Sequence, residues 1–204
     1  MAPKKGSSDG LNLSRRGFLK STGIVGIATA VVSPVESEAQ ARVAEVGPGD
    51  VPVRLTVNGR QLNLMIEPRV TLLDALRMRA DMTGNKRVCD RGQCGACTMI
   101  VDGRTVYSCS TLAIEVQGKA IRTVDGLSTG AVLHPVQQAF VDKDGLMCGF
   151  CTPGFVMAMT AFLEKSRNPT REQIAKGLDG NICRCGTFVR IMEAAMQAKG
   201  VVHA

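Results

Sequence analysis

Residues 89–109 read CDRGQCGACTMIVDGRTVYSC, and the spacing of the four cysteines in this stretch decides how the chain is interpreted. Cys89, Cys94 and Cys97 follow a C-x4-C-x2-C pattern, and Cys109 comes later in the chain. Three cysteines on one short loop plus a fourth nearby are the usual ligands of a plant-type [2Fe–2S] cluster. The glycines between them let the loop curve and leave amide N–H groups close to the sulfurs. A zinc knuckle or a pair of disulfides is the alternative, although zinc sites more often use two C-x2-C-like pairs.

The segments around this loop predict a small sheet with one helix. Residues 51–57 and 61–66 alternate as half-buried strands do, and Asn58-Gly59 between them favours a hairpin turn. Residues 99–101 and 105–107 form a second hairpin through Asp102-Gly103, which should fold Cys109 back beside Cys97. A last strand is expected near 120–124. Between the hairpins, Thr71 begins a capped helix that runs to about Met78. Its apolar side chains are expected to pack on the first hairpin: Leu72, Leu73, Leu76 and Met78.

From about residue 127 the pattern becomes helical. Pro135 suits a first helical position, and a second helix is expected after Pro153. Thr170 and Gln173 form a capping box for a third, and residues 188–199 carry the fourth. One apolar face of the first helix consists of Val136, Ala139, Phe140 and Val141. We therefore predict an α+β chain: a β-grasp, ferredoxin-like domain at 51–126, then a four-helix bundle at 127–204.

The helical part holds a second cysteine set, Cys148 and Cys151 as C-x2-C, then Cys183 and Cys185 as C-x-C at the start of the last helix. The spacing alone allows structural zinc. The neighbouring iron–sulfur pattern argues for a second [2Fe–2S] cluster instead. So does Thr152-Pro153-Gly154, which places Cys151 just before a helix N-terminus, where amide dipoles favour an anionic sulfur.

The N-terminus is typical of an export signal. Residues 14–20, SRRGFLK, hold a twin-arginine pattern, residues 23–32 are weakly apolar, and Ala39-Gln40-Ala41 offers a cleavage site. We expect a twin-arginine signal peptide at 1–41 and a linker at 42–50. A retained membrane anchor and a basic, disordered tail are the alternatives. Export by the twin-arginine translocase to the periplasm would carry clusters already inserted in the cytoplasm.

The composition excludes some functions. With 45% hydrophobic residues the chain can bury a core. Its net charge of +7 suits an acidic partner, but it has no Trp and one Tyr, so the stacking residues of a nucleic-acid-binding protein are missing.

Three motifs together carry a family resemblance. The chain resembles the small iron–sulfur subunits of the molybdenum hydroxylases, the family that includes xanthine dehydrogenases and aldehyde oxidoreductases. The resemblance covers about residues 51–200. It rests on the sequences CDRGQCGACT at 89–98, CGFCTPG at 148–154 and GNICRCG at 180–186.

The resemblance implies a role beyond what the spacing shows. The cluster on Cys148, Cys151, Cys183 and Cys185 should lie nearest the molybdopterin cofactor of a separate large subunit, with Cys185 against the pterin edge. Electrons would pass to it from molybdenum, then to the cluster on Cys89, Cys94, Cys97 and Cys109, then to a c-type cytochrome or an FAD subunit. The substrate would be an aldehyde or an N-heterocycle, and no residue of this chain would be catalytic. Many relatives have Gln before the first cysteine of the helical set, to bond the pterin. Here the residue is Met147, which has no such donor.

Two other functions remain alternatives at this point. The chain could be an exported structural protein whose cysteines hold zinc or disulfides, or a free ferredoxin-like electron carrier. Among the remaining residues, His134 is expected to be a local helix cap or surface residue, and Met157 and Met159 are expected to pack in the core. Arg87, Arg91 and Arg104 could steer an acidic electron acceptor, but solvated surface charge is the default interpretation.

Overall fold

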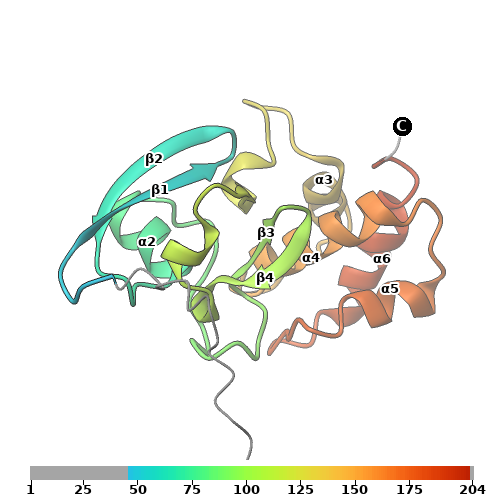
Figure 1. Cartoon of the computed structure of the whole chain (residues 1–204). Helices are drawn as coiled ribbons and strands as arrows, with labels where there is room; N and C mark the ends of the chain where they lie inside the picture. The colour runs from blue at the N-terminus through green and yellow to red at the C-terminus, as the bar shows by residue number, and fades with distance from the viewer. Residues whose placement is uncertain (1–45, 203–204) are drawn as a thin grey trace, which may run out of the picture. The chain divides into compact units, whose positions relative to one another are not determined.

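The computed structural model describes residues 46–202 of the 204-residue chain. The predicted leader at 1–41 and the first part of the predicted linker lie outside these residues. From Val46 onward the chain forms one compact unit. Its elements are drawn in Figure 1 and follow in this order: β1 (Val51–Val57), β2 (Arg60–Ile66), α2 (Leu72–Arg79), β3 (Thr98–Val101), β4 (Arg104–Tyr107), β5 (Ala120–Arg122), α3 (Pro135–Asp142), α4 (Thr152–Lys165), α5 (Arg171–Gly177) and α6 (Phe188–Ala198).

The five strands form one mixed sheet in the order β2-β1-β5-β3-β4. β1 and β5 are parallel, and the other neighbours are antiparallel. Both predicted hairpins are confirmed. Asn58 and Gly59 have φ angles of 50° and 76°, as a turn with two left-handed residues requires. The last strand ends at Arg122, two residues earlier than predicted, because Val124–Gly126 forms a 3-10 turn.

Helix α2 covers the sheet as predicted, with one exception. Thr71 caps it, since its hydroxyl accepts a hydrogen bond from the Asp74 N–H at 3.2 Å. Leu72, Leu73 and Leu76 are fully buried. Met78 is 69% exposed, so the expectation that it packs on the hairpin was wrong. Residues two apart lie on opposite sides of a helix, and Met78 therefore points away from the face that Leu76 buries.

Strand β3 separates two hydrophobic cores. All four of its residues are buried. Successive side chains of a strand point to opposite faces. Met99 and Val101 accordingly join the core of the sheet and α2, whereas Ile100 joins the core of the helices. The sheet and the helices thus share a strand.

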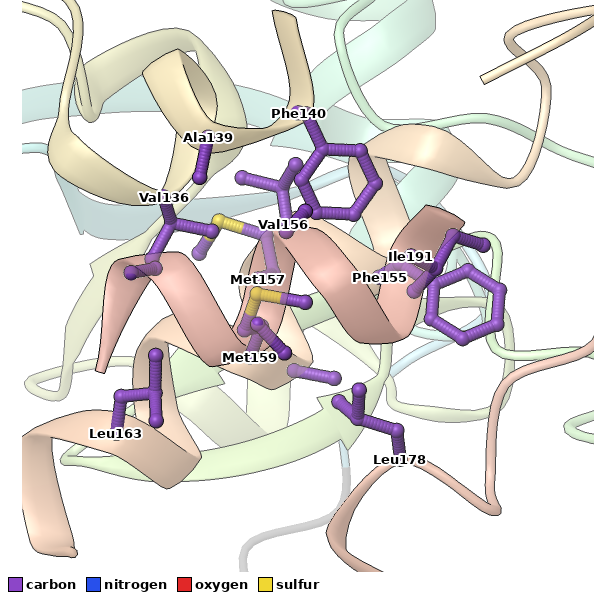
Figure 2. Packing of buried hydrophobic residues seen from close by; sticks show 14 of the residues in the cluster. Val136, Ala139, Phe140, Phe155, Val156, Met157, Met159, Leu163, Leu178 and Ile191 are labelled. Atoms are coloured by element: carbon purple, nitrogen blue, oxygen red, sulfur yellow. The ribbon is translucent and has the colours of Figure 1, made fainter. Parts of the chain in front are cut away.

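Helix α4 is the centre of the helical core. It is buried on nearly all sides from Gly154 to Ala161, and it contacts β3, α3, α5 and α6. Figure 2 shows its side chains meeting Val136 and Phe140 from α3 and Ile191 from α6. Met157 and Met159 are buried there, which confirms their predicted role in the core.

The other helices agree with the predicted pattern except at single residues. The capping box of Thr170 and Gln173 begins α5, and His134 caps α3, both as predicted. α5 ends at Gly177. Val141 is 60% exposed, so its place in the apolar face of α3 was wrong.

At the level of a mixed sheet followed by helices, the α+β prediction is confirmed. Among residues 46–202, no helix has the length and apolar character that crossing a membrane requires.

Candidate functional site

Three cysteines of the first set, Cys89, Cys94 and Cys97, lie on the loop between α2 and β3. Asp90, Gly92 and Gly95 all have left-handed φ angles, at 56°, 67° and 71°. These three left-handed residues between Cys89 and Cys97 turn the chain back on itself, so that backbone N–H groups face the sulfurs. Gly95 is also sterically required, because an added Cβ would lie 2.5 Å from Asn181 Nδ2.

The β3–β4 hairpin brings the fourth cysteine to this loop. Thr98 pairs with Tyr107 across the hairpin, and the Ser108 hydroxyl donates to the Cys97 carbonyl at 2.7 Å. Cys109 follows in a 3-10 turn, Ser108–Ser110. The Cys109 thiol interacts electrostatically with that of Cys97. The prediction that the Asp102-Gly103 turn folds Cys109 back beside Cys97 is confirmed.

The thiols of this set interact electrostatically most directly in two pairs, Cys89 with Cys94 and Cys97 with Cys109. Burial opposes ionisation of Cys89. Hydrogen bonds from the Arg91, Gln93 and Cys94 backbone outweigh it and lower the pKa of Cys89 to about 6. The pKa of Cys97 is raised to about 11, mainly by burial.

Cys109 has a backbone donor of its own. The Gly92 N–H donates to Cys109 Sγ at 3.3 Å. The loop therefore presents several N–H groups to sulfur, which is how proteins stabilise thiolates around iron–sulfur clusters.

The second set lies at the start of α4 and in the turn before α6. Cys151 is the N-cap residue of α4, as its position before a helix start predicted, and Cys148 is in the preceding loop. Cys183 and Cys185 lie in a turn before α6. The prediction that they start that helix was wrong. The left-handed Gly186 (φ 80°) separates them from its first residue, Phe188.

These thiols also form two pairs, Cys148 with Cys185 and Cys151 with Cys183. Burial and the neighbouring Cys183 raise the pKa of Cys151 to about 12. Burial raises the pKa of Cys183, but hydrogen bonds from Thr187 lower it. The resulting pKa is about 7. Two adjacent thiolates repel each other, so one partner stays protonated unless a cation lies between them.

The donor sets fit two binuclear clusters. All eight cysteines are free of disulfides. Within residues 46–202, no three His, Cys, Asp or Glu side chains converge as they would around one metal ion. A [2Fe–2S] cluster does not need such a group, because four cysteines serve two irons, two at each. Two thiol pairs at each site match this requirement. When bound, such a cluster supplies a centre that accepts and releases one electron.

The two sites differ in exposure. Cys97, Cys109 and Cys183 are buried, whereas Cys148 and Cys185 are exposed. Met147 is next to Cys148 and is 73% exposed. Exposed apolar residues lie close to the cysteines of the second set along the chain, and we call them the apolar rim: Leu146, Met147, Phe150, Ile182, Phe188 and Val189.

The loops that carry the two sets touch each other. The Ile182 N–H donates to the Cys94 carbonyl at 2.9 Å, and Asn181 Nδ2 donates to the Gly95 carbonyl at 2.9 Å. Tyr107 Oη donates to the Gly180 carbonyl at 2.8 Å. Sequence reasoning assigned no role to Asn181 or Tyr107. The only available signal was their closeness to cysteines along the chain.

The basic residues near the first set do not act alike. All three arginines are exposed, and Arg87 also forms an ion pair with Asp74. The predicted steering of an acidic acceptor by these residues stays a prediction.

Comparisons with family models match both parts of the chain. Residues 61–152 match a 2Fe-2S iron-sulfur cluster binding domain, and residues 123–196 match a [2Fe-2S] binding domain.

Known proteins match most of the chain. The nicotine 6-hydroxylase small subunit of Paenarthrobacter nicotinovorans is 46% identical over 152 residues, covering 74% of this chain and 92% of that protein. The aldehyde oxidoreductase iron-sulfur-binding subunit PaoA of Escherichia coli K12 is 38% identical over 208 residues, covering 94% and 90%. The crystal structure of quinoline 2-oxidoreductase from Pseudomonas putida 86 matches with a TM-score of 0.73 at 35% identity, covering 76% of this chain and 96% of that chain.

Proposed function

This chain belongs to the family of small iron–sulfur subunits of the molybdenum hydroxylases, and from this premise we propose which of its residues carry electrons and between which partners. In this family the catalytic centre, with its molybdopterin cofactor, is on the large subunit. We assign one [2Fe–2S] cluster to Cys89, Cys94, Cys97 and Cys109, and a second to Cys148, Cys151, Cys183 and Cys185.

The observation that carries this assignment is that four thiols interact at each site, with the Gly92 N–H 3.3 Å from Cys109 Sγ and the Thr187 hydroxyl 3.1 Å from Cys183 Sγ. Every pair also has backbone or hydroxyl donors directed at sulfur. Such donors stabilise negative charge on the sulfurs of a cluster.

The exposure of the second set indicates the direction of electron flow. An electron must enter and leave through sites that partners can approach closely. The apolar rim near Cys148 and Cys185 is a surface of the kind that a permanent partner buries. We assign it to the large subunit, with Cys185 and Met147 facing the molybdopterin. Met147 would contribute only apolar contact there. The first cluster then delivers electrons to the acceptor.

The same reasoning gives a proposed domain division. The sheet order with β1 and β5 parallel, and α2 across it, supports a β-grasp, ferredoxin-like domain at 51–126. Helices α3 to α6 support a four-helix bundle at 127–204. Residues 42–50 would link the first domain to a leader at 1–41.

We propose an aldehyde or an N-heterocycle as the substrate of the complex. The relatives support both classes, since their names specify nicotine, quinoline and aldehyde oxidation. The substrate pocket would lie on the large subunit.

Export to the periplasm by the twin-arginine translocase is a further part of the proposal. The alignment with the Escherichia coli subunit covers 94% of the chain and therefore extends well into residues 1–45. The paired Arg15 and Arg16 lie in that segment. Outside the cytoplasm a c-type cytochrome is a more suitable acceptor than NAD, with an FAD subunit as the other choice. Membrane association would come through a partner.

The assignment is tested on the chain purified with its large subunit. We expect about four irons per chain and two distinct paramagnetic signals after reduction with dithionite. Cys185→Ser should remove or alter only the signal of the second cluster and stop turnover while substrate still binds to the large subunit. A colourless zinc protein, or normal turnover in Cys185→Ser, would contradict the proposal.

Export is tested separately. Replacing both arginines by lysine, Arg15→Lys with Arg16→Lys, should leave the folded, iron-containing chain in the cytoplasm, because the translocase recognises the arginine pair. Undiminished arrival of the double variant in the periplasm would remove this part of the proposal.

A further inference from the structure

Thr187 is placed to cap a helix but does not do so. It is the N-cap residue of α6, directly after the left-handed Gly186. A threonine at this position normally accepts a hydrogen bond from a first-turn backbone N–H. The N-cap threonines of α2 and α5, Thr71 and Thr170, do so at 3.2 and 3.3 Å. The Thr187 side chain makes no capping hydrogen bond.

Its hydroxyl instead lies against a cysteine. Thr187 Oγ1 is 3.1 Å from Cys183 Sγ. Cys183 is only 5% exposed, so little water competes for this contact. A thiolate can only accept a hydrogen bond, and a threonine hydroxyl can donate one. The helix therefore begins without a side-chain cap, and the hydroxyl that would have accepted the capping hydrogen bond lies against sulfur instead.

We propose that Thr187 tunes the second cluster, making it easier to reduce by donating its hydroxyl hydrogen to Cys183 Sγ. This inference rests on the proposed assignment of Cys183 as a ligand of that cluster. The one-electron reduction breaks no bond and adds one negative charge, which the iron and the sulfurs share. A donor to a ligand sulfur stabilises this added charge more than the oxidised state, so the reduction potential rises.

In the first set a backbone N–H is nearer to sulfur than the neighbouring hydroxyl is. Cys109 Sγ accepts from the Gly92 backbone N–H at 3.3 Å, while Ser110 Oγ is 3.6 Å away. Substituting a side chain cannot remove the Gly92 donor. Substitution of Thr187 removes its hydroxyl without altering the backbone. The potential of the first cluster serves as an internal reference.

The experiment is a redox titration followed by electron paramagnetic resonance, on the chain in complex with its large subunit. Thr187→Val removes the hydroxyl and keeps the branched shape, and Thr187→Ser keeps the hydroxyl. In Thr187→Val we expect the reduced-to-oxidised ratio of the second cluster at a fixed potential to fall about tenfold, which is about 59 mV for a one-electron couple. Thr187→Ser should titrate close to wild type, and the first cluster should not shift in either variant.

Thr187→Ala is the second hydroxyl-free variant, in case the valine methyl group displaces the sulfur. It should shift in the same direction as Thr187→Val. Unchanged potentials in both, or an equal shift in Thr187→Ser, would overturn the inference. Loss of the second cluster in both hydroxyl-free variants, with retention in Thr187→Ser, would also overturn it in favour of a structural role. A wild-type complex that lacks the second signal would instead contradict the assignment of Cys183 itself.

Discussion

At the scale of single residues, Gly154 shows how tightly the two cysteine-bearing parts are packed. It lies in the first turn of α4, where an added Cβ would overlap the Gly95 carbonyl oxygen and lie 2.8 Å from the Ala96 Cα. Glycine in a helix is about 0.5–1 kcal/mol less favourable than alanine. The chain accepts that cost here because the loop of the first set passes directly over the helix.

We predict that Gly154→Ala destabilises the protein although alanine is the better helix former. The obstacle is backbone, which cannot rotate away, and overpacking typically costs about 1–3 kcal/mol. This exceeds the gain in helix propensity, so the free energy of unfolding in urea, followed by far-UV circular dichroism, should fall. Gly49→Ala is the matched control, since nothing lies within 4 Å of its added Cβ. Unchanged or increased stability in Gly154→Ala would contradict the close approach.

At the scale of one element, the start of α3 depends on a neutral imidazole. The Val136 N–H donates to His134 Nδ1 at 3.3 Å, and the His134 N–H donates to Gln137 Oε1 at 3.0 Å. A protonated imidazole has no lone pair with which to accept the first bond. Burial lowers the pKa of His134 below 6.5, with Arg122 adding to the effect and Glu164 opposing it.

This cap predicts a defined pH dependence. Between the lowered pKa of folded His134 and the value of 6.5 for the unfolded chain, the unfolded state binds more protons. The stabilisation is therefore complete above pH 6.5 and declines as the pH falls below it. Unfolding measured from pH 7.5 to 5 should show this loss in wild type. His134→Asn, a cap that does not titrate, should lack that component. Parallel pH profiles for the two proteins would contradict the prediction.

At the scale of the whole molecule, the apolar rim near Cys148 and Cys185 predicts where the large subunit binds. Val189 lies on this rim and is 63% exposed in the free chain. A charge placed there would be buried without a partner in the complex. We expect Val189→Glu to weaken binding of the large subunit at least about tenfold, or about 1.4 kcal/mol, with both cluster signals retained.

Met78→Glu is the control for this experiment. Met78 is 69% exposed and also helical, but it lies on α2, far along the chain from the rim. It should bind like wild type when the affinity is measured by titration of the immobilised large subunit. Equal weakening by both substitutions would show that added charge, and not the rim, is responsible.

Local rules account for what the sequence predicted correctly. The turns at Asn58-Gly59 and Asp102-Gly103 and the caps at Thr71 and Thr170 depend on residues within four positions of each other, so they can be recognised without tertiary structure. The cysteine spacings within the loops can also be recognised from the sequence, although each complete set joins distant segments. The exceptions, Met78 and Val141, are apolar residues that helical periodicity places away from the buried face, so their apolar character alone did not predict burial.

What the sequence alone determined is therefore the type and order of the elements and the chemistry of the ligands. Only the tertiary structure decided which thiols pair, which face of β3 meets the helices, and how Asn181 reaches Gly95 from 86 residues away. The reason is physical. Backbone conformation and capping follow from neighbouring residues, whereas contacts between distant segments depend on how whole faces pack, and no local pattern records that.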